Sequence, residues 1–120
     1  CHVGANLGGE SYELMGLRQH YFEARGTELT EEDNGRYKQT QDERDRHRFK
    51  VPGLRNIELT WPYYHDGTRA TMEEAVRDMA LYQCDATLDD AEVASIVAFL
   101  RTLTGEYQGQ KLTSDNKQEN

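Results

Sequence analysis

The sequence predicts a mainly α domain in which short helices are joined by long ordered loops. Two segments after residue 70 repeat apolar side chains at helical spacing, and each follows a helix-capping signal. The remaining sequence lacks the alternation of apolar and polar residues that indicates strands. At 120 residues the chain is long enough for one domain with one small core.

The first half of the sequence predicts two different kinds of loop. Residues 1–22 indicate a packed loop, because glycines repeatedly interrupt the apolar residues. Residues 23–48 are almost wholly polar and predict an exposed, mobile excursion whose charges are solvated, although a docking role stays open. His20 and His47, which flank or lie within this excursion, are expected to be exposed.

Apolar and aromatic residues return in the segment 49–67. Pro52 and Pro62 break the segment, and the Asp66-Gly67 pair is a turn signal. We expect tightly packed irregular structure with one turn of helix around residues 54–57. Trp61 is equally compatible with a place in the core and with a place at a domain interface.

Two helices are expected in the last third of the chain. Thr71 followed by Glu74 is a capping-box signature, and the apolar residues behind it recur at helical spacing through Tyr82. The pair Thr87 and Asp90 repeats the signature before a second helix, which we expect to run to Gly105 as its C-cap. The polar tail after the second helix is expected to fray.

The acidic composition narrows the classes of partner that the protein is expected to bind. A net charge of −8 argues against nucleic acid and anionic membrane surfaces, and it suits a basic protein or a cation. No apolar run approaches the roughly 20 residues that cross a bilayer. The segment is therefore expected to be soluble, with any export signal upstream of it.

The chain opens on Cys1-His2, the last two letters of the C-x-x-C-H signal for c-type haem attachment. We expect the missing C-x-x to lie just before residue 1. A Cys-His pair alone is weak evidence for haem attachment, because most such pairs are accidental. A disulfide between Cys1 and Cys84, or two free thiols, is the alternative. Met79 would supply a second axial ligand, but a methionine on an apolar helix face is usually core, and Met72 and Met15 also qualify.

Two stretches of the sequence resemble the C-terminal haem domain of bacterial dihaem cytochrome c peroxidases. They are FKVPGLRNIELTWPYYHDGTRATMEEAVRDM and LDDAEVASIVAFLRTLTG, and the opening CHVGANLGG fits the same family directly after its second C-x-x-C-H. The likeness covers residues 1–105, is weakest within 23–48 and is most specific within 51–67. It implies an N-terminally truncated, cytochrome c-like haem domain over residues 1–107, followed by a polar tail at 108–120.

The resemblance implies a covalent haem c and a set of residues around it. Cys1 is implied to form the second thioether bond, His2 to be the proximal iron ligand and Met79 the distal one. A His/Met pair favours ferrous iron and raises the reduction potential. The Pro52 carbonyl is implied to orient Nδ1 of His2, and Arg55 is either a partner of a haem propionate or a surface arginine.

A calcium site and a partner domain are also implied. Thr60 and Pro62 match positions whose main-chain carbonyls hold calcium between two haem domains. His65 matches a position that is not an axial ligand, so we expect a structural or propionate-side role for it. The partner is implied to be the N-terminal peroxidatic haem domain of the same protein, and the family allows a homodimer.

The implied function is electron entry into a peroxidase. Electrons would come from a small donor (cytochrome c, cupredoxin or quinol) and pass to the peroxidatic haem, where hydrogen peroxide is reduced to water. No residue of this chain is assigned a catalytic role, because that domain lies outside the sequence. Thioether attachment implies the periplasm.

Three alternatives stay open. The first is a monohaem electron carrier, and the second is the haem domain of a quinol peroxidase or MauG-like enzyme. The MauG-type enzymes place tyrosine where Met79 stands, so the methionine favours the peroxidase. The third alternative is a haem-free domain with a disulfide between Cys1 and Cys84.

Overall fold

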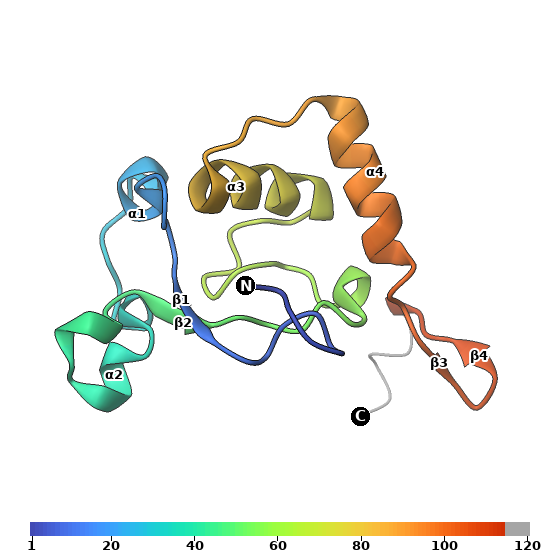
Figure 1. Ribbon diagram of the computed structural model, residues 1–120, viewed down its shortest axis with the longest axis horizontal. Helices are drawn as coiled ribbons and strands as arrows, with labels where there is room; N and C mark the ends of the chain where they lie inside the picture. The colour runs from blue at the N-terminus through green and yellow to red at the C-terminus, as the bar shows by residue number, and fades with distance from the viewer. Residues whose placement is uncertain (115–120) are drawn as a thin grey trace.

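The computed structural model describes residues 1–114 and shows short helices, 3-10 turns and very short strands joined by long loops (Figure 1). In chain order the elements are β1 (Tyr12–Leu14), α1 (Tyr21–Arg25), η1 (Glu32–Asn34), α2 (Tyr37–Thr40), η2 (Glu43–Asp45), β2 (Arg48–Lys50), η3 (Ile57–Leu59), α3 (Met72–Cys84), α4 (Asp90–Arg101), β3 (Glu106–Tyr107) and β4 (Gln110–Lys111). Among these residues, no helix combines the length and apolar character needed to cross a membrane.

The main apolar core lies between α3, α4 and the loop before α3. It consists of Tyr63, Met72, Val93, Val97 and Leu100. Val93, Val97 and Leu100 recur on one face of α4 at spacings of four and three residues, which is the helical period. The mainly α prediction is therefore confirmed for this half of the molecule.

The helix ends show where the sequence pattern was right and where it was wrong. Helix α3 begins with the predicted capping box of Thr71 and Glu74. Helix α4 is capped instead by Asp89 and Glu92, so the prediction of Thr87 was wrong by two residues. An aspartate is as good an N-cap as a threonine, and only Asp89 has a glutamate three residues later to return the hydrogen bond.

The predicted C-cap of α4 was also wrong. The helix ends at Arg101, and the following residues bend toward the η3 loop. There the side-chain oxygen of Asn56 accepts from Gly105 N at 2.7 Å, and Asn56 N donates to the Leu103 carbonyl at 3.0 Å. The same Asn56 adopts φ 61°, so the helical turn expected around 54–57 forms three residues later, as η3.

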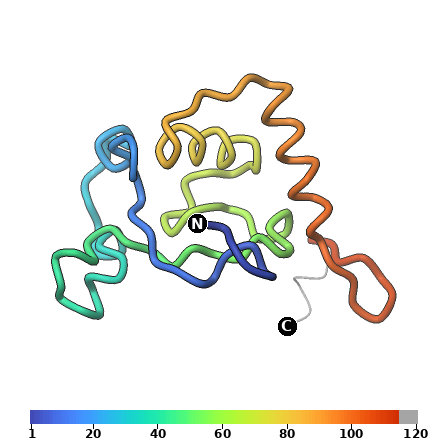
Figure 2. The backbone as a smooth tube through the Cα atoms, viewed as in Figure 1, coloured from blue at the N-terminus to red at the C-terminus, as the bar shows by residue number. Residues whose placement is uncertain are grey.

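Two antiparallel ribbons were not predicted. Strands β1 and β2 pair through Tyr12↔Lys50, Glu13↔Phe49 and Leu14↔Arg48. The chain before the polar excursion therefore lies beside the chain at its end (Figure 2). Strands β3 and β4 form a hairpin around Gln108 and Gly109, which both adopt positive φ. This hairpin spans the boundary between domain and tail that was expected at 107/108. Residues 108–114 are therefore not a frayed tail, and the rest of that prediction lies outside the described residues. Strands of two or three residues are too short to show an alternating pattern.

The polar excursion is exposed on its surface but is not structureless. Residues 23–48 contain η1, α2, η2 and part of α1, and they enclose Asp33, whose exposed fraction is 0 %. The expectation that the charges of this segment are solvated was wrong for Asp33, whose carboxylate is buried together with cationic partners.

Candidate functional site

The His2 side chain is held by two main-chain carbonyls. Its Nδ1 lies 3.0 Å from the Leu7 oxygen and 3.1 Å from the Pro52 oxygen. A carbonyl only accepts hydrogen bonds, so Nδ1 must carry the proton. In the neutral imidazole the lone pair is then on Nε2, and this is a form in which histidine binds a metal. The expected contact between Pro52 and His2 is present, although the two residues are 50 positions apart.

Glycine makes this arrangement possible. Gly8 has φ 142°, and a Cβ at this position would lie 2.1 Å from the Pro52 oxygen. Next to it, Gly9 N donates to the Val51 carbonyl at 2.6 Å, and Leu54 N donates to the Asn6 carbonyl at 3.1 Å. The loop after His2 is therefore pinned to the Val51–Leu54 segment, and a side chain at Gly8 would displace the carbonyl that orients the imidazole.

Both cysteines are free and exposed in the structure. The alternative of a disulfide between Cys1 and Cys84 is therefore not supported. Cys84 ends α3, whereas Cys1 directly precedes the oriented histidine. The thiol of Cys1 is thus available for covalent chemistry next to an imidazole with a free Nε2.

The three methionines occupy different environments, which the helix pattern could not separate. Met72 is 7 % exposed and belongs to the α3–α4 core, and Met15 is buried. Met79 lies two turns further along α3, is half-buried and is not a member of that core cluster. Of the three, Met79 is the thioether that is least committed to packing.

The remaining predicted residues lie on exposed loops. Arg55 is exposed and makes no ion pair within residues 1–114. Thr60 and Pro62 are exposed and flank a cis Trp61-Pro62 peptide bond. Trp61 is 56 % exposed, so it does not fill the core and the interface alternative is the one left. The roles expected for Arg55, Thr60 and Pro62 stay predictions.

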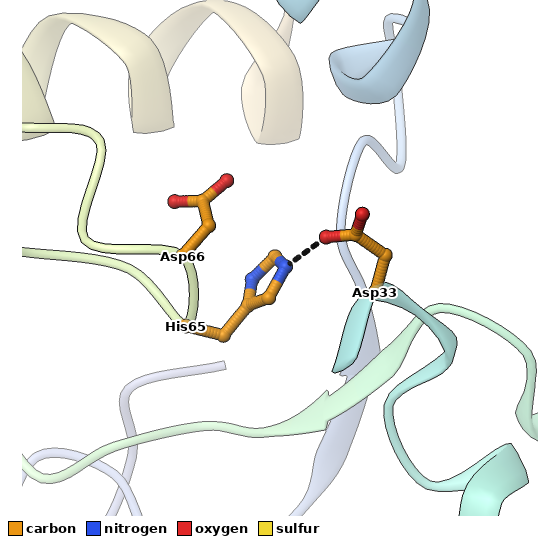
Figure 3. Close-up of side chains that lie close together, drawn as sticks. All are labelled: Asp33, His65 and Asp66. Atoms are coloured by element: carbon orange, nitrogen blue, oxygen red, sulfur yellow. Dashed lines mark hydrogen bonds and ion pairs between the residues drawn. The ribbon is translucent and has the colours of Figure 1, made fainter. Parts of the chain in front are cut away.

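A second cluster of polar side chains joins the excursion to the turn after Tyr64. His65 Nε2 lies 2.7 Å from Asp33, and Figure 3 shows the imidazole pointing at this carboxylate while Asp66 is turned away from the pair. Arg25 donates to Asp33 at 2.9 and 2.7 Å and to Asp66 at 3.0 Å. Thr30 N gives Asp33 a further hydrogen bond at 2.7 Å.

The charges in this cluster are balanced within the chain. The Arg25 guanidinium keeps the pKa of Asp33 well below its usual range, and Asp33 in turn raises the pKa of Arg25. Tyr21 donates to Asp66 at 2.7 Å, and burial raises the pKa of Tyr21 to about 12. Atoms of Asp33, His65 and Asp66 lie within 4.8 Å of one another, but Arg25 already supplies the cation that a metal would provide. This cluster, which we call the Asp33 network, is therefore structural.

The Asp33 network was not predicted from the sequence. His65 was expected to have a structural or propionate-side role, and its contact with Asp33 agrees with the structural alternative. His47 was wrongly expected to be exposed. Its Nδ1 lies 2.7 Å from the Asp33 main-chain oxygen, and its ring packs on Phe22 at a centroid distance of 4.6 Å. His20 is exposed, as expected. Neither Arg25 nor Asp33 stands out in a segment where most residues are charged.

Comparison with known proteins matches the chain to part of bacterial cytochrome c peroxidases. It is 47 % identical over 112 residues to a cytochrome c551 peroxidase of Nitrosomonas europaea, covering 93 % of this chain and 32 % of that protein. It is 46 % identical over 107 residues to the cytochrome c peroxidase Ccp of Escherichia coli, covering 89 % of this chain and 22 % of that protein. No family model matches the chain.

A solved structure agrees with these relatives. A MauG-like protein associated with microbial copper homeostasis superposes with a TM-score of 0.65 at 29 % identity, covering 88 % of this chain and 42 % of that one. The chain thus spans about a third or less of the two peroxidases, and the family resemblance found in its sequence is confirmed.

Proposed function

We propose that this chain, which belongs to the bacterial cytochrome c peroxidase family, is a cytochrome c-like haem domain that accepts electrons singly. It would relay them to a peroxidatic haem in another domain of the same protein, where hydrogen peroxide is reduced to water. The names of the relatives support a peroxidase-related haem domain, and the partial coverage of their length supports a partner domain.

The observation that carries the proposal is the tautomer imposed on His2. Two carbonyl acceptors select the tautomer of the neutral imidazole that carries its proton on Nδ1 and its lone pair on Nε2, so His2 is oriented to donate that lone pair to iron. A hydrogen bond from Nδ1–H to a carbonyl also strengthens the imidazole as a donor. A histidine with only a structural role at the surface would not need Nδ1 to be held by the Leu7 and Pro52 carbonyls.

The other donors fit a c-type haem as well. Cys1 is a free thiol beside His2 and would form one thioether bond, with the other from a cysteine three residues earlier. Met79 would be the distal ligand, because Met72 and Met15 are taken up by packing. When bound, the haem supplies a one-electron redox centre whose His/Met ligation favours the ferrous state. With both axial positions filled, the domain would transfer electrons rather than bind peroxide.

The residues on the exposed loops would contact the haem propionates and the neighbouring haem domain. Arg55 has a guanidinium without an acid partner in residues 1–114, which suits a haem propionate. The carbonyls of Thr60 and Pro62 would hold calcium where the two haem domains meet, with the exposed Trp61 in the same contact. Thioether attachment would place the protein in the periplasm, with a small cytochrome c, a cupredoxin or a quinol as donor.

Ligation is tested by visible and near-infrared spectra of the full-length protein and its Met79→Ala variant. The parent is expected to show a c-type spectrum and a weak sulfur-to-iron band in the near infrared, and Met79→Ala should lose the band from this domain while keeping the covalent haem. Met72→Leu is the matched control, because it alters a buried methionine of the same helix and should keep the band. Absence of covalent haem at Cys1, or loss of the band only in Met72→Leu, would refute the proposal.

A further inference from the structure

The cations of this acidic protein are concentrated in one segment. Six of its 14 lysines and arginines lie between residues 36 and 50, against three acids in the same stretch. Four of the six are neutralised, through the pairs Arg36–Asp45, Lys38–Glu32, Arg44–Asp42 and Arg46–Glu43. Arg48 and Lys50 face no acid at ion-pair distance within residues 1–114.

These two cations lie on the same face of β2. Residues two apart in a strand project to the same side, and their cross-strand partners Leu14 and Tyr12 project there as well. The guanidinium of Arg36, which is paired with Asp45, lies 4.4 Å from the centroid of the Tyr12 ring. Within residues 1–114, the side chain of Arg48 uses only its Nε, which donates to the Arg44 carbonyl at 2.7 Å. Its terminal nitrogens stay available for a ligand.

A hollow of about 450 Å³ lies between this face and α2, at the end of the molecule away from α4 (Figure 1). Its lining includes Tyr12, Arg36, Arg48, Phe49 and Lys50. We call it the cationic hollow.

The backbone fixes the wall of the cationic hollow. Gly35 has φ 59°, and a Cβ there would lie 2.3 Å from the Arg48 oxygen. Its neighbour Arg36 donates its N–H to that same oxygen at 2.8 Å. The approach of α2 to β2 therefore depends on a glycine and a main-chain hydrogen bond, so the backbone that carries Arg36 and Arg48 is positioned before any ligand binds.

We propose that the cationic hollow docks an acidic segment of a partner protein, whose Asp or Glu carboxylates would meet Arg48 and Lys50. A planar guanidinium matches a carboxylate through two parallel hydrogen bonds. Tyr12, 43 % exposed, would provide the aromatic contact that protein interfaces favour. Nucleic acid and anionic membranes fit less well, because an extended polyanion would also meet the acidic remainder of a chain with net charge −8. The inference does not rest on the haem.

The test uses the full-length, haem-loaded protein and a fluorescently labelled peptide of eight glutamates, followed by fluorescence anisotropy over a salt series. Binding is expected to weaken as salt rises, and the double variant Arg48→Gln/Lys50→Gln should bind about tenfold more weakly. The control Lys38→Gln/Arg44→Gln removes the same charge from cations that do not line the hollow, so it should lose less than about twofold.

The single variant Lys50→Gln separates a loss of binding from a failure of the double variant to fold. Lys50 is exposed and has no partner within residues 1–114, so this variant should fold normally and still bind the peptide more weakly than the parent. No binding of the peptide by the parent would overturn the proposal, as would equal losses in the two double variants. Competition by inorganic phosphate at the same concentration as the peptide would overturn it too, because it would reveal a site for small anions. Anionic vesicles that bind only through Lys50, while the peptide does not bind, would reveal a membrane site instead.

Discussion

The α3–α4 core is formed by five apolar side chains, whereas the segment 21–50 is organised around one buried carboxylate. Both regions are ordered, but different forces order them. Apolar burial is nondirectional and tolerates exchange of one aliphatic residue for another of similar volume. The Asp33 network depends on charge and geometry, so removal of one member leaves the others buried with less compensation for their charges. The first region should therefore be robust to conservative change and the second should not.

The largest expected effect is that of Asp33→Asn. The substitution keeps the shape of the side chain but removes the charge that faces Arg25 and His65. We expect a loss of about 3 kcal/mol in the free energy of local unfolding, the lower end of the range for a broken buried pair, because Asp66 still faces Arg25. Hydrogen exchange of the full-length protein should show faster exchange in residues 21–50 and unchanged exchange in α4.

Asp42→Asn provides the matched control for this substitution. Asp42 also pairs with an arginine, but the Arg44 partner is 89 % exposed, so little change is expected. Uniformly faster exchange across both regions in Asp33→Asn would show that the two regions unfold as one unit. That result would remove the distinction drawn between them.

Acid should separate the two regions in the same way. Arg25 holds the pKa of folded Asp33 below its usual range, so the stabilising effect is complete above the unfolded pKa of about 4 and is lost as the pH falls toward the folded value. Hydrogen exchange measured from pH 6 to pH 2.5, corrected for the intrinsic rate, should show residues 21–50 losing protection before α4 does. Asp33→Asn lacks this titration, so its protection should vary less with pH over the same range. Parallel pH dependences of parent and variant would contradict the assignment.

These two regions also differ in how far the sequence predicts them. The α3–α4 region follows from helical periodicity and from Thr71 with Glu74, both of which are local signals. The Asp33 network joins Arg25 to Asp66 across 41 positions, and no local pattern reports such a contact. The candidate site is only partly predicted from the sequence. A motif and a family resemblance identify Cys1, His2 and Met79. The two carbonyl acceptors of Nδ1 and the separate environments of Met72 and Met79 need the structure.

The smallest effect tests the start of α4, where a local pattern favoured Thr87 and the structure has Asp89. The Asp89 carboxylate accepts from Glu92 N at 2.8 Å, and Glu92 returns a hydrogen bond to Asp89 N at 2.9 Å. Asp89→Ala removes the cap and should reduce stability by about 1 kcal/mol, whereas Thr87→Ala should change it little, because Thr87 makes no side-chain hydrogen bond within residues 1–114. Urea unfolding of the full-length protein, followed by circular dichroism, measures both variants. If Thr87→Ala costs as much as Asp89→Ala, the helix begins where the sequence pattern placed it; if only Asp89→Ala is destabilised, reciprocity with Glu92 decides between two adjacent capping signals.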